Sequence, residues 1–485
     1  MPGLRFKLNG CMVAVDDLSP TLTLLQYLRQ TGLCGTKEGC AEGDCGACSV
    51  AILDADAPDG PSWRAVNACL VFLPMVQGRE VRTVEGISVD GEPHPAQQQL
   101  VDRLGSQCGY CTPGIVMSLF EACYRDDLDH DWKIDDQLCG NLCRCTGYRP
   151  IREAARAVSA LRPHDQFSEA LDGATASDLR VHYECGGDRY QCPASMSELW
   201  DAIDRAPGAR FIVGGTDLAL AVTKRFESLP DLISLEGIGE LRGVTEGPDR
   251  WSIGANTTLS DLEAATAEVL PAIARMLRFF ASRQIKNRAT LGGNLCNASP
   301  IGDMAPVMMA LSAELVLSSR SGERRVALDE FFLDYRKTAL RDGEILKAVE
   351  VPVPAADVRL GAYKVSKRRE LDISAVCAGF ALRLDESGRV AEIRLCYGGL
   401  AATTARARQT EAALVGEVWS EASIESALGL LDQDFSPIDD QRGSAWYRGT
   451  LARNLLRGFY LETLDAPFRA LPERPSSTLV LGDSP

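Results

Sequence analysis

The first hydrophobic pattern in the chain is an alternation over residues 4–15, where apolar and polar side chains take turns. Leu4, Phe6 and Leu8 share one face of this pattern, and an Asn-Gly pair at residues 9–10 interrupts it. Period-two alternation on both sides of such a pair predicts two β-strands joined by a tight turn.

A helical spacing of leucines comes next, at Leu22, Leu25 and Leu28, shortly after a proline. A glycine-rich loop at residues 35–48 and a short apolar strand, Ser49–Leu53, follow it. The order of strand, strand, helix, loop and strand is typical of a small β-grasp domain, which we expect over residues 1–83.

From about residue 85 to residue 160 the hydrophobic spacing becomes that of helices. Pro113 suits a first helical turn, and the apolar residues behind it recur on one face. A second helix is expected over Ile151–Leu161. We therefore predict a helical domain over residues 84–161, and a linker over residues 162–190, where periodicity is weak and glycine recurs.

Beyond residue 191 strand-like and helix-like segments alternate, which indicates an α/β or α+β arrangement. Ile373–Leu384 and Val390–Tyr397 flank a turn and predict a hairpin, and a helical pattern lies near Ala412–Leu431. These segments predict a small α+β domain over residues 369–475, after another domain at 191–368. The whole chain is expected to be a multidomain α+β protein with a flexible tail at 476–485.

The composition of the 485 residues is that of an ordinary folded protein, 45% hydrophobic and 24% charged. A net charge of −16 disfavours partners such as nucleic acid or an anionic membrane surface. The first 15 residues lack the apolar core of a signal peptide, and no segment has the ~18 to 20 apolar residues of a membrane span. We expect a cytoplasmic protein.

Cysteine is the exception in this composition, with 17 residues, of which twelve precede residue 150. In a long chain without a secretion signal, metal ligation explains such cysteines better than disulfides do. Eight of the twelve lie in two tight groups. Metal chemistry is therefore expected in the first third of the chain.

The first group, Cys40, Cys45 and Cys48, has the spacing C-x4-C-x2-C, with Cys69 about twenty residues later. This is the plant-type ferredoxin spacing of a 2Fe–2S cluster. Glycines between the cysteines let the backbone approach the cluster closely and expose N–H groups to it. A structural zinc site is the alternative, although zinc more often uses paired C-x2-C knuckles.

The second group places Cys108 and Cys111 directly before a predicted helix, and Cys139, Cys143 and Cys145 some thirty residues later. Four thiolates from these two segments could hold another 2Fe–2S cluster within a helical bundle. Spacing alone does not tell which two of the last three cysteines are ligands, and a zinc ion remains an alternative.

Two segments around these cysteines resemble the helical iron–sulfur domain of the xanthine oxidase family of molybdenum hydroxylases: QCGYCTPG at residues 107–114 and GNLCRCTGYRP at residues 140–150. The resemblance implies that Cys108, Cys111, Cys143 and Cys145 are the ligands and that Cys139 is not. It also implies that this cluster lies nearer a molybdenum cofactor, with Gln107 close to the pterin. The plant-type cluster would then lie between it and a flavin.

Two glycine pairs in the next domain suggest a flavin site. Phe211–Leu218 is a short strand that runs into Gly214-Gly215, and a second pair, Gly292-Gly293, lies within residues 288–303. Glycine turns can cradle a pyrophosphate, but neither is the Rossmann G-x-G-x-x-G, and each alone is a weak signal.

Together the two segments resemble the FAD domain of the same family, which is of the vanillyl-alcohol-oxidase type. By this resemblance the first segment would contact the FAD diphosphate and ribose, the second would form the other pyrophosphate wall, and further residues would line the adenine and isoalloxazine. The implied set is Phe211, Ile212, Val213, Gly214, Gly215, Thr216, Asp217, Leu218, Phe280, Thr290, Leu291, Gly292, Gly293, Asn294, Asp303, Leu346 and Lys364. For Lys364 a solvated strand end is the alternative. The C-terminal domain would resemble that of a carbon monoxide dehydrogenase flavoprotein.

No catalytic residues are identified in the chain, because its four histidines are isolated and no nucleophile–base pattern is present. The resemblance implies a separate large subunit that holds molybdopterin, in a heterotetramer with two copies of each chain. It implies electron transfer through both clusters to FAD and then NAD, as hypoxanthine and xanthine are oxidised to urate. Alternatives are another molybdenum hydroxylase, acting on an aldehyde, carbon monoxide or an N-heterocycle, and a stand-alone flavin-linked ferredoxin reductase.

Overall fold

The computed structural model describes residues 3–369 and 371–464 of the chain. The predicted tail at 476–485 lies outside these residues. The chain divides into two compact units. The first unit consists of Met1–Glu240, Thr258–Asp261 and Ala281–Ala289, and the second unit of Leu241–Thr257, Leu262–Phe280 and Thr290–Pro485.

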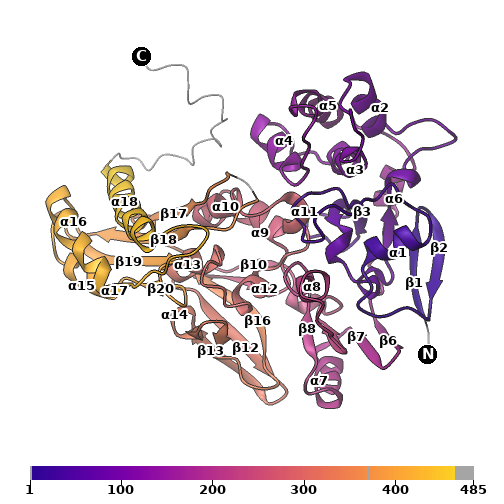
Figure 1. Ribbon diagram of the computed structural model, residues 1–485. Helices are drawn as coiled ribbons and strands as arrows, with labels where there is room; N and C mark the ends of the chain where they lie inside the picture. The colour runs from indigo at the N-terminus through magenta and orange to yellow at the C-terminus, as the bar shows by residue number, and fades with distance from the viewer. Residues whose placement is uncertain (1–2, 370, 465–485) are drawn as a thin grey trace. The chain divides into compact units, whose positions relative to one another are not determined.

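The N-terminal part of the first unit is a five-stranded sheet in the order β2-β1-β5-β3-β4 (Figure 1). Strands β1 and β5 are parallel and the other neighbours antiparallel. Helix α1 buries its leucines against the sheet in one hydrophobic core, and the Thr23 side chain caps its first turn. This is the predicted β-grasp fold: β1 (Leu4–Leu8), β2 (Cys11–Val15), α1 (Leu24–Gln30), β3 (Ser49–Asp54), β4 (Ser62–Asn67) and β5 (Glu80–Arg82).

The helical part of the first unit follows as predicted, with α3 buried at its centre. Pro113 lies in the first turn of α3, and the second predicted helix begins two residues earlier than expected, at Arg149. The helices are α2 (Pro95–Asp102), α3 (Thr112–Cys123), α4 (Asp131–Leu138) and α5 (Arg149–Ser159).

The segment predicted as a linker, residues 162–190, is more regular than a linker. It contains α6 (Gln166–Asp172) and most of a β-hairpin. Phe167 of α6 is fully buried, and its ring lies edge-on to those of Trp63 and Phe120. A seven-residue helix shows almost no periodicity, so the contact that orders it could not be read from the local pattern.

The first unit ends with a four-stranded sheet in the order β6-β7-β9-β8. Its strands are β6 (Val181–Cys185), β7 (Asp188–Cys192), β8 (Arg210–Ile212) and β9 (Asp231–Ser234). Its helices are α7 (Met196–Arg205), α8 (Ala219–Thr223) and, from a later part of the chain, α11 (Arg283–Lys286). Helix α9 (Leu259–Thr266) runs from the first unit into the second.

The second unit begins with an antiparallel sheet in the order β10-β11-β16-β12-β13. The strands are β10 (Val244–Glu246), β11 (Arg250–Gly254), β12 (Glu314–Ser319), β13 (Gly322–Ala327) and β16 (Ile345–Pro352), with a small hairpin of β14 (Phe332–Asp334) and β15 (Lys337–Thr338). The accompanying helices are α10 (Pro271–Leu277), α12 (Leu291–Cys296), α13 (Met304–Ala310) and α14 (Leu328–Phe331).

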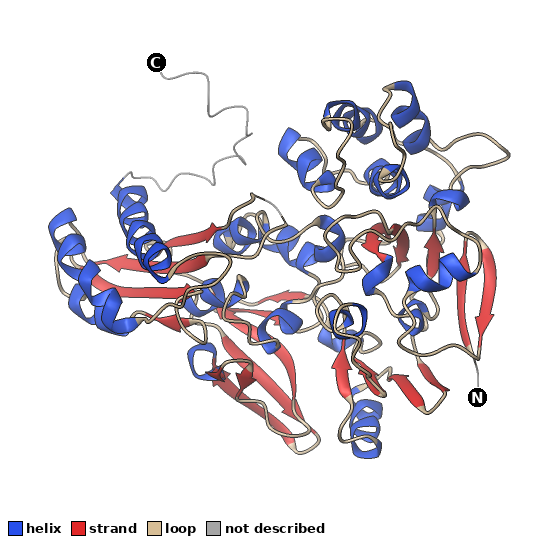
Figure 2. Ribbon diagram, viewed as in Figure 1, coloured by secondary structure: helices blue, strands red, loops and turns tan. Residues whose placement is uncertain are grey.

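A second sheet of this unit, in the order β17-β18-β19-β20, has helices on both faces (Figure 2). Strand β18 is buried from Val376 to Leu382 because Gly379 abuts α13, while the ring of Phe380 packs on Phe459 of α18. The predicted hairpin is confirmed as β18 (Val376–Leu384) and β19 (Val390–Gly398). The other strands are β17 (Arg359–Val365) and β20 (Ala405–Arg406).

The helical pattern predicted near 412–431 is confirmed as helical, and it is divided among several short helices. Gly416 lies between the first two with a φ of +85°, a left-handed conformation that ends a helix. The C-terminal helices are α15 (Arg408–Leu414), α16 (Glu421–Ala427), α17 (Leu431–Asp434) and α18 (Ala445–Leu464). None of the helices in the described part of the chain is long and apolar enough to cross a membrane.

Candidate electron-transfer site

The plant-type cysteines lie on a loop between α1 and β3, with Cys69 in a short 3-10 turn, Ala68–Leu70, after β4. Gly43 and Gly46 of this loop have φ values of +84° and +69°, which other residues rarely adopt. The loop turns backbone N–H groups toward Cys40, whose Sγ accepts from Glu42, Asp44 and Cys45 at 3.3–3.4 Å. Three backbone N–H groups therefore donate to the sulfur of Cys40, as expected for a loop that binds a cluster.

The four thiols of this group form two pairs. Cys40 and Cys45 share a hydrogen bond, which lowers the pKa of Cys40 to about 5 and raises the pKa of Cys45. Cys48 and Cys69 share another, which lowers the pKa of Cys48 and raises the pKa of Cys69. A 2Fe–2S cluster with four cysteine ligands needs two thiolates on each iron, and this pairing supplies them.

The helical group is paired in the same way, across the start of α3 and the loop between α4 and α5. Cys111 contacts Cys143, and Cys108 contacts Cys145. Burial and the contact with Cys143 raise the pKa of the Cys111 thiol to about 12, while Cys108 and Cys145 are exposed. Cys139 instead ends α4, and its thiol donates to the carbonyl oxygen of Ala281 at 3.9 Å.

Neither group resembles a single-ion site. Within residues 3–369 and 371–464, no three His, Cys, Asp or Glu side chains converge as they would on one metal ion. Tetrahedral zinc would require its four ligands around one point. Two separate pairs of thiols suit two irons bridged by sulfide better, so the arrangement fits 2Fe–2S clusters in both loops.

The two cysteine loops contact each other directly. Leu142 N donates to the carbonyl oxygen of Cys45 at 3.0 Å, and Asn141 Nδ2 donates to that of Gly46 at 3.2 Å. A Cβ on Gly114 of α3 would collide with the Gly46 backbone, and a Cβ on Gly46 with the Gly140 backbone. A residue next to Cys143 is thus hydrogen-bonded to Cys45, which brings the backbones of the two groups together.

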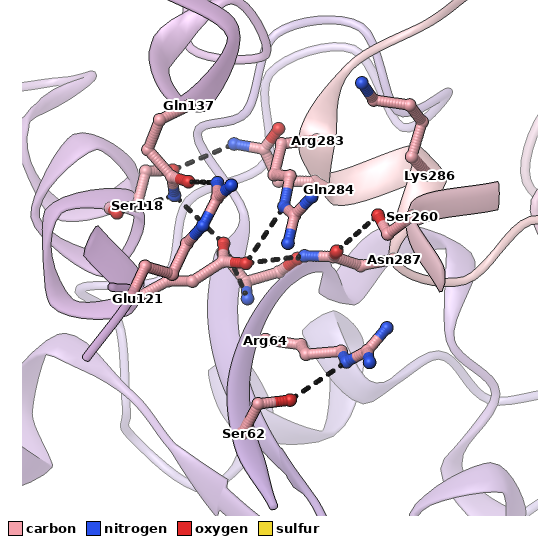
Figure 3. A network of polar contacts seen from close by, with 12 residues as sticks. Ser62, Arg64, Ser118, Glu121, Gln137, Ser260, Arg283, Gln284, Lys286 and Asn287 are labelled. Carbon is pink, nitrogen blue, oxygen red and sulfur yellow. Dashed lines mark hydrogen bonds and ion pairs between the residues drawn. The ribbon is translucent and has the colours of Figure 1, made fainter. Parts of the chain in front are cut away.

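A buried carboxylate, Glu121 on α3, joins the segments around these loops (Figure 3). Its Oε1 accepts from Arg283 at 3.2 Å and from Asn287 at 3.1 Å, both from the α11 segment. Its Oε2 accepts from Gln137 of α4 at 2.9 Å and from the N–H of Ala65 in β4 at 3.2 Å. Helix α11, the helical bundle and the β-grasp sheet therefore share one polar network.

A second part of this network reaches the cysteine loops. Asn141 Oδ1 accepts from Ser118 at 2.6 Å and from Gln284 at 2.9 Å, and all three side chains are buried. Gln284 belongs to α11. Asn141, which donates to the carbonyl oxygen of Gly46, is therefore held by hydrogen bonds from α3 and from α11.

The first predicted flavin segment lies wholly in the first unit. Phe211 and Ile212 belong to β8, and the following turn leads through Thr216, Asp217 and Leu218 into α8. A side chain at Gly214 would collide with the Arg288 backbone, and one at Gly215, whose φ is +77°, with that of Leu70. This turn therefore lies beside the residue after Cys69.

The remaining predicted flavin residues all lie in the second unit. Thr290 caps α12 by accepting from Gly293 N at 3.1 Å, and a side chain at Gly292 would collide with Ala255. Asn294 Oδ1 is buried and has no hydrogen-bond partner among the described residues. An unpaired buried acceptor on this turn fits a bound ligand with hydrogen-bond donors, such as FAD.

Phe280, Asp303 and Lys364 are brought together in the second unit. Lys364 Nζ donates to Asp303 Oδ2 at 2.6 Å and lies 5.8 Å from the centre of the Phe280 ring. Ser374 Oγ donates to the other Asp303 oxygen at 2.5 Å. The Lys364 side chain is only 3% exposed, so the alternative of a solvated strand end is wrong. Leu346 is buried on β16, which α12 contacts.

Sequence reasoning missed the polar residues that support the cysteine loops: Ser118, Glu121, Asn141 and Gln284. Asn141 lies inside the quoted segment GNLCRCTGYRP and could have been found there. The others come from helices whose local pattern marks them only as ordinary polar positions.

Four protein-family models match the chain and together cover most of it. A 2Fe-2S iron-sulfur cluster binding domain matches residues 6–73, and a [2Fe-2S] binding domain residues 83–156. The FAD binding domain in molybdopterin dehydrogenase matches residues 182–354, and the CO dehydrogenase flavoprotein C-terminal domain residues 361–463.

The chain is similar to proteins over most or about half of its length. Xanthine dehydrogenase of Emericella nidulans is 34% identical over 95% of this chain, and xanthine dehydrogenase/oxidase of Rattus norvegicus 33% identical over 96%. The chain spans 38% and 39% of the length of these two relatives. Among solved structures, a chain of carbon monoxide dehydrogenase from Hydrogenophaga pseudoflava is similar with a TM-score of 0.53 and 28% identity, over 56% of this chain and 94% of that one.

The family matches, the paired thiols and the similar proteins agree on the class of protein. They identify a chain made of two 2Fe–2S domains, an FAD-binding domain and a CO dehydrogenase flavoprotein C-terminal domain, and this chain is similar to xanthine dehydrogenases and to a chain of carbon monoxide dehydrogenase.

Proposed function

We propose that this chain is the electron-transfer subunit of a xanthine dehydrogenase. In this role it receives electrons from molybdopterin on a large partner subunit, as hypoxanthine and xanthine are oxidised to urate. It passes them to NAD. The observation that carries the proposal is the sequence of contacts from one cysteine group to the other and on to the first flavin segment, all within the first unit.

The proposed ligands of the plant-type cluster are Cys40, Cys45, Cys48 and Cys69, and those of the helical cluster are Cys108, Cys111, Cys143 and Cys145. The paired thiols support both sets. The proposed FAD residues are Phe211–Leu218, Phe280, Thr290–Asn294, Asp303, Leu346 and Lys364. When bound, these groups supply one-electron carriers and a flavin that can transfer hydride to a nicotinamide.

The chain's own residues supply the positions of these groups. Backbone N–H groups point at Cys40, and the network of Glu121 and Asn141 holds the two cysteine loops in contact. The exposure of Cys108 and Cys145 leaves the helical group open to a donor outside these residues, while Cys48 and Cys69 are buried. This difference in exposure supports an order of electron transfer in which the helical cluster is reduced first and the plant-type cluster second.

The first test is the cofactor content of the purified chain. We expect about four irons, an equal amount of acid-labile sulfide and about one FAD per chain. Zinc in place of iron, or a protein without flavin, would contradict the proposal.

The second test concerns the substrate. The similarity to xanthine dehydrogenases over almost the whole chain supports purines. The complex with its large subunit, expected as two copies of each chain, should reduce NAD with xanthine. If the intact complex turns over no purine, the xanthine assignment falls, although the electron-transfer role remains.

A second candidate keeps the role but changes the substrate, because a carbon monoxide dehydrogenase chain has a similar structure over 56% of this chain. Assaying the same complex with carbon monoxide, an aldehyde and an N-heterocycle separates these cases. A stand-alone ferredoxin reductase would instead reduce free carriers with NADH without any molybdenum subunit, which the purified chain alone tests.

A further inference from the structure

The loop after Cys143 contains a side-chain hydrogen bond to a proposed cluster ligand. Thr146 Oγ1 lies 3.1 Å from Cys143 Sγ. Among the described residues, no other hydroxyl is recorded beside any of the eight proposed ligand sulfurs, so Thr146 distinguishes Cys143 from the others.

The direction of the Thr146 hydrogen bond follows from its neighbours. Tyr148 N donates to Thr146 Oγ1 at 3.2 Å, so the hydroxyl oxygen already acts as an acceptor. A cysteine that binds iron is a thiolate and has no proton to give. The Thr146 hydroxyl proton is therefore the one that lies between oxygen and sulfur.

The loop holds this geometry at a conformational cost. Tyr148 has a φ of +65°, in the left-handed region that residues other than glycine rarely adopt. Two hydrogen bonds keep it there, because Tyr148 N donates to Thr146 and the Tyr148 hydroxyl accepts from Cys143 N at 2.9 Å. Cys143, Thr146 and Tyr148 thus form a closed set of bonds in six residues.

We propose that Thr146 raises the reduction potential of the helical cluster by donating its hydroxyl hydrogen bond to Cys143 Sγ. This inference rests on the proposed function, in which Cys143 is a ligand. The reduced cluster carries one more negative charge than the oxidised cluster. A donor at a ligand sulfur stabilises the reduced form more, because hydrogen bonds to negatively charged acceptors are the stronger ones.

The experiment is a reductive titration of the purified full-length chain, followed by EPR, with Thr146→Val and Thr146→Ser. Valine keeps the branched shape without the hydroxyl, and serine keeps the hydroxyl. We expect valine to shift the reduction equilibrium of the helical cluster about tenfold toward the oxidised form, which is about 59 mV for one electron. Serine should leave the midpoint near that of the wild type.

Thr112→Val is the matched control. Thr112 also directly follows a proposed ligand, Cys111, but its hydroxyl lies 2.7 Å from that of Ser106. The midpoint potential of the helical cluster in Thr112→Val should equal that of the wild type. The plant-type cluster serves as an internal reference in every variant.

The outcomes separate this inference from the proposed function. A wild-type chain without a second 2Fe–2S signal would remove the proposed function itself. A Thr146→Val chain with both clusters and an unchanged midpoint would overturn the inference alone. If Thr146→Val and Thr146→Ala both lose the helical cluster, the inference is also wrong. Thr146 would then be needed to assemble the cluster loop and not to set the reduction potential of the cluster.

Discussion

Cys139, Cys143 and Cys145 lie within seven residues of sequence, and the directions of their side chains distinguish the proposed ligands from Cys139. Cys143 and Cys145 face Cys111 and Cys108, whereas the thiol of Cys139 points to the carbonyl oxygen of Ala281. The spacing left this choice open. The tertiary structure supports the pair that the family resemblance implies.

A pair of serine variants tests this choice. We expect Cys145→Ser to lower the iron content from about four to about two per chain and to abolish one EPR signal, because the cluster loses a ligand. Cys139→Ser, the matched control, should keep all the iron and both signals. Iron analysis and EPR of the reduced chain measure both, and equal losses in the two variants would contradict the assignment.

Glu121 is the residue on which most of the polar network converges, so its loss should loosen that network locally. We expect Glu121→Ala to leave Arg283 and Asn287 without this acceptor and to cost about 3 kcal/mol. That cost corresponds to roughly a hundredfold faster amide hydrogen exchange in α3 and α11.

Ser260→Ala is the control for Glu121, since Ser260 donates a single 2.8 Å hydrogen bond to Asn287 and does not touch the carboxylate. Its effect should be about 1 kcal/mol. Hydrogen exchange followed by mass spectrometry measures both variants. Unchanged protection of α3 in Glu121→Ala would refute a structural role for the network.

At the scale of single elements, the short helix α6 is stabilised by the Asp165 cap at its start and by the buried ring of Phe167. Asp165 accepts at its side chain from the N–H groups of Phe167 and Ser168 at the helix start, and from the hydroxyl of Tyr124. Burial alone would raise the pKa of Asp165, but these bonds and His94 outweigh it and lower that pKa to about 2.

This depressed pKa predicts a pH dependence. A carboxyl with a folded pKa of about 2 and an unfolded pKa of about 3.9 stabilises the fold above pH ~4, and the stabilisation is lost as pH falls toward 2. We expect Asp165→Asn, which can still cap the helix, to cost about 1 to 2 kcal/mol near neutral pH. Thermal unfolding measures it: the difference from wild type should stay constant from pH 7.5 to 5 and shrink below pH 4. A difference that grows on acidification would disprove the role of the charge.

Other elements show where local patterns succeed. Alternation on both sides of an Asn-Gly pair predicted β1 and β2, and two apolar segments on both sides of a turn predicted β18 and β19. The helical pattern near residues 412–431 did not show where its helices begin and end, although Gly416, with a positive φ, separates α15 from α16. Periodicity identifies the kind of element better than its ends.

At the scale of the whole molecule, the cofactors depend on different residues and should be separable. We expect removal of FAD at high salt to leave both 2Fe–2S signals after reduction with dithionite. NADH should then no longer reduce the clusters, because the proposed path for hydride begins at the flavin. Stopped-flow absorption measures the reduction, and adding FAD back should restore it. Rapid reduction by NADH without flavin would contradict this path.

The sequence by itself indicated the cysteines that we propose as iron ligands and the order of the domains, because cluster loops require cysteines and glycines at short, fixed spacings. It also determined the strands with one buried face. Only the tertiary structure decided which thiols pair, that the two cysteine loops share hydrogen bonds, that Phe167 anchors α6 and that Lys364 is buried. These features depend on contacts between segments up to about a hundred residues apart, and local spacing carries no record of them.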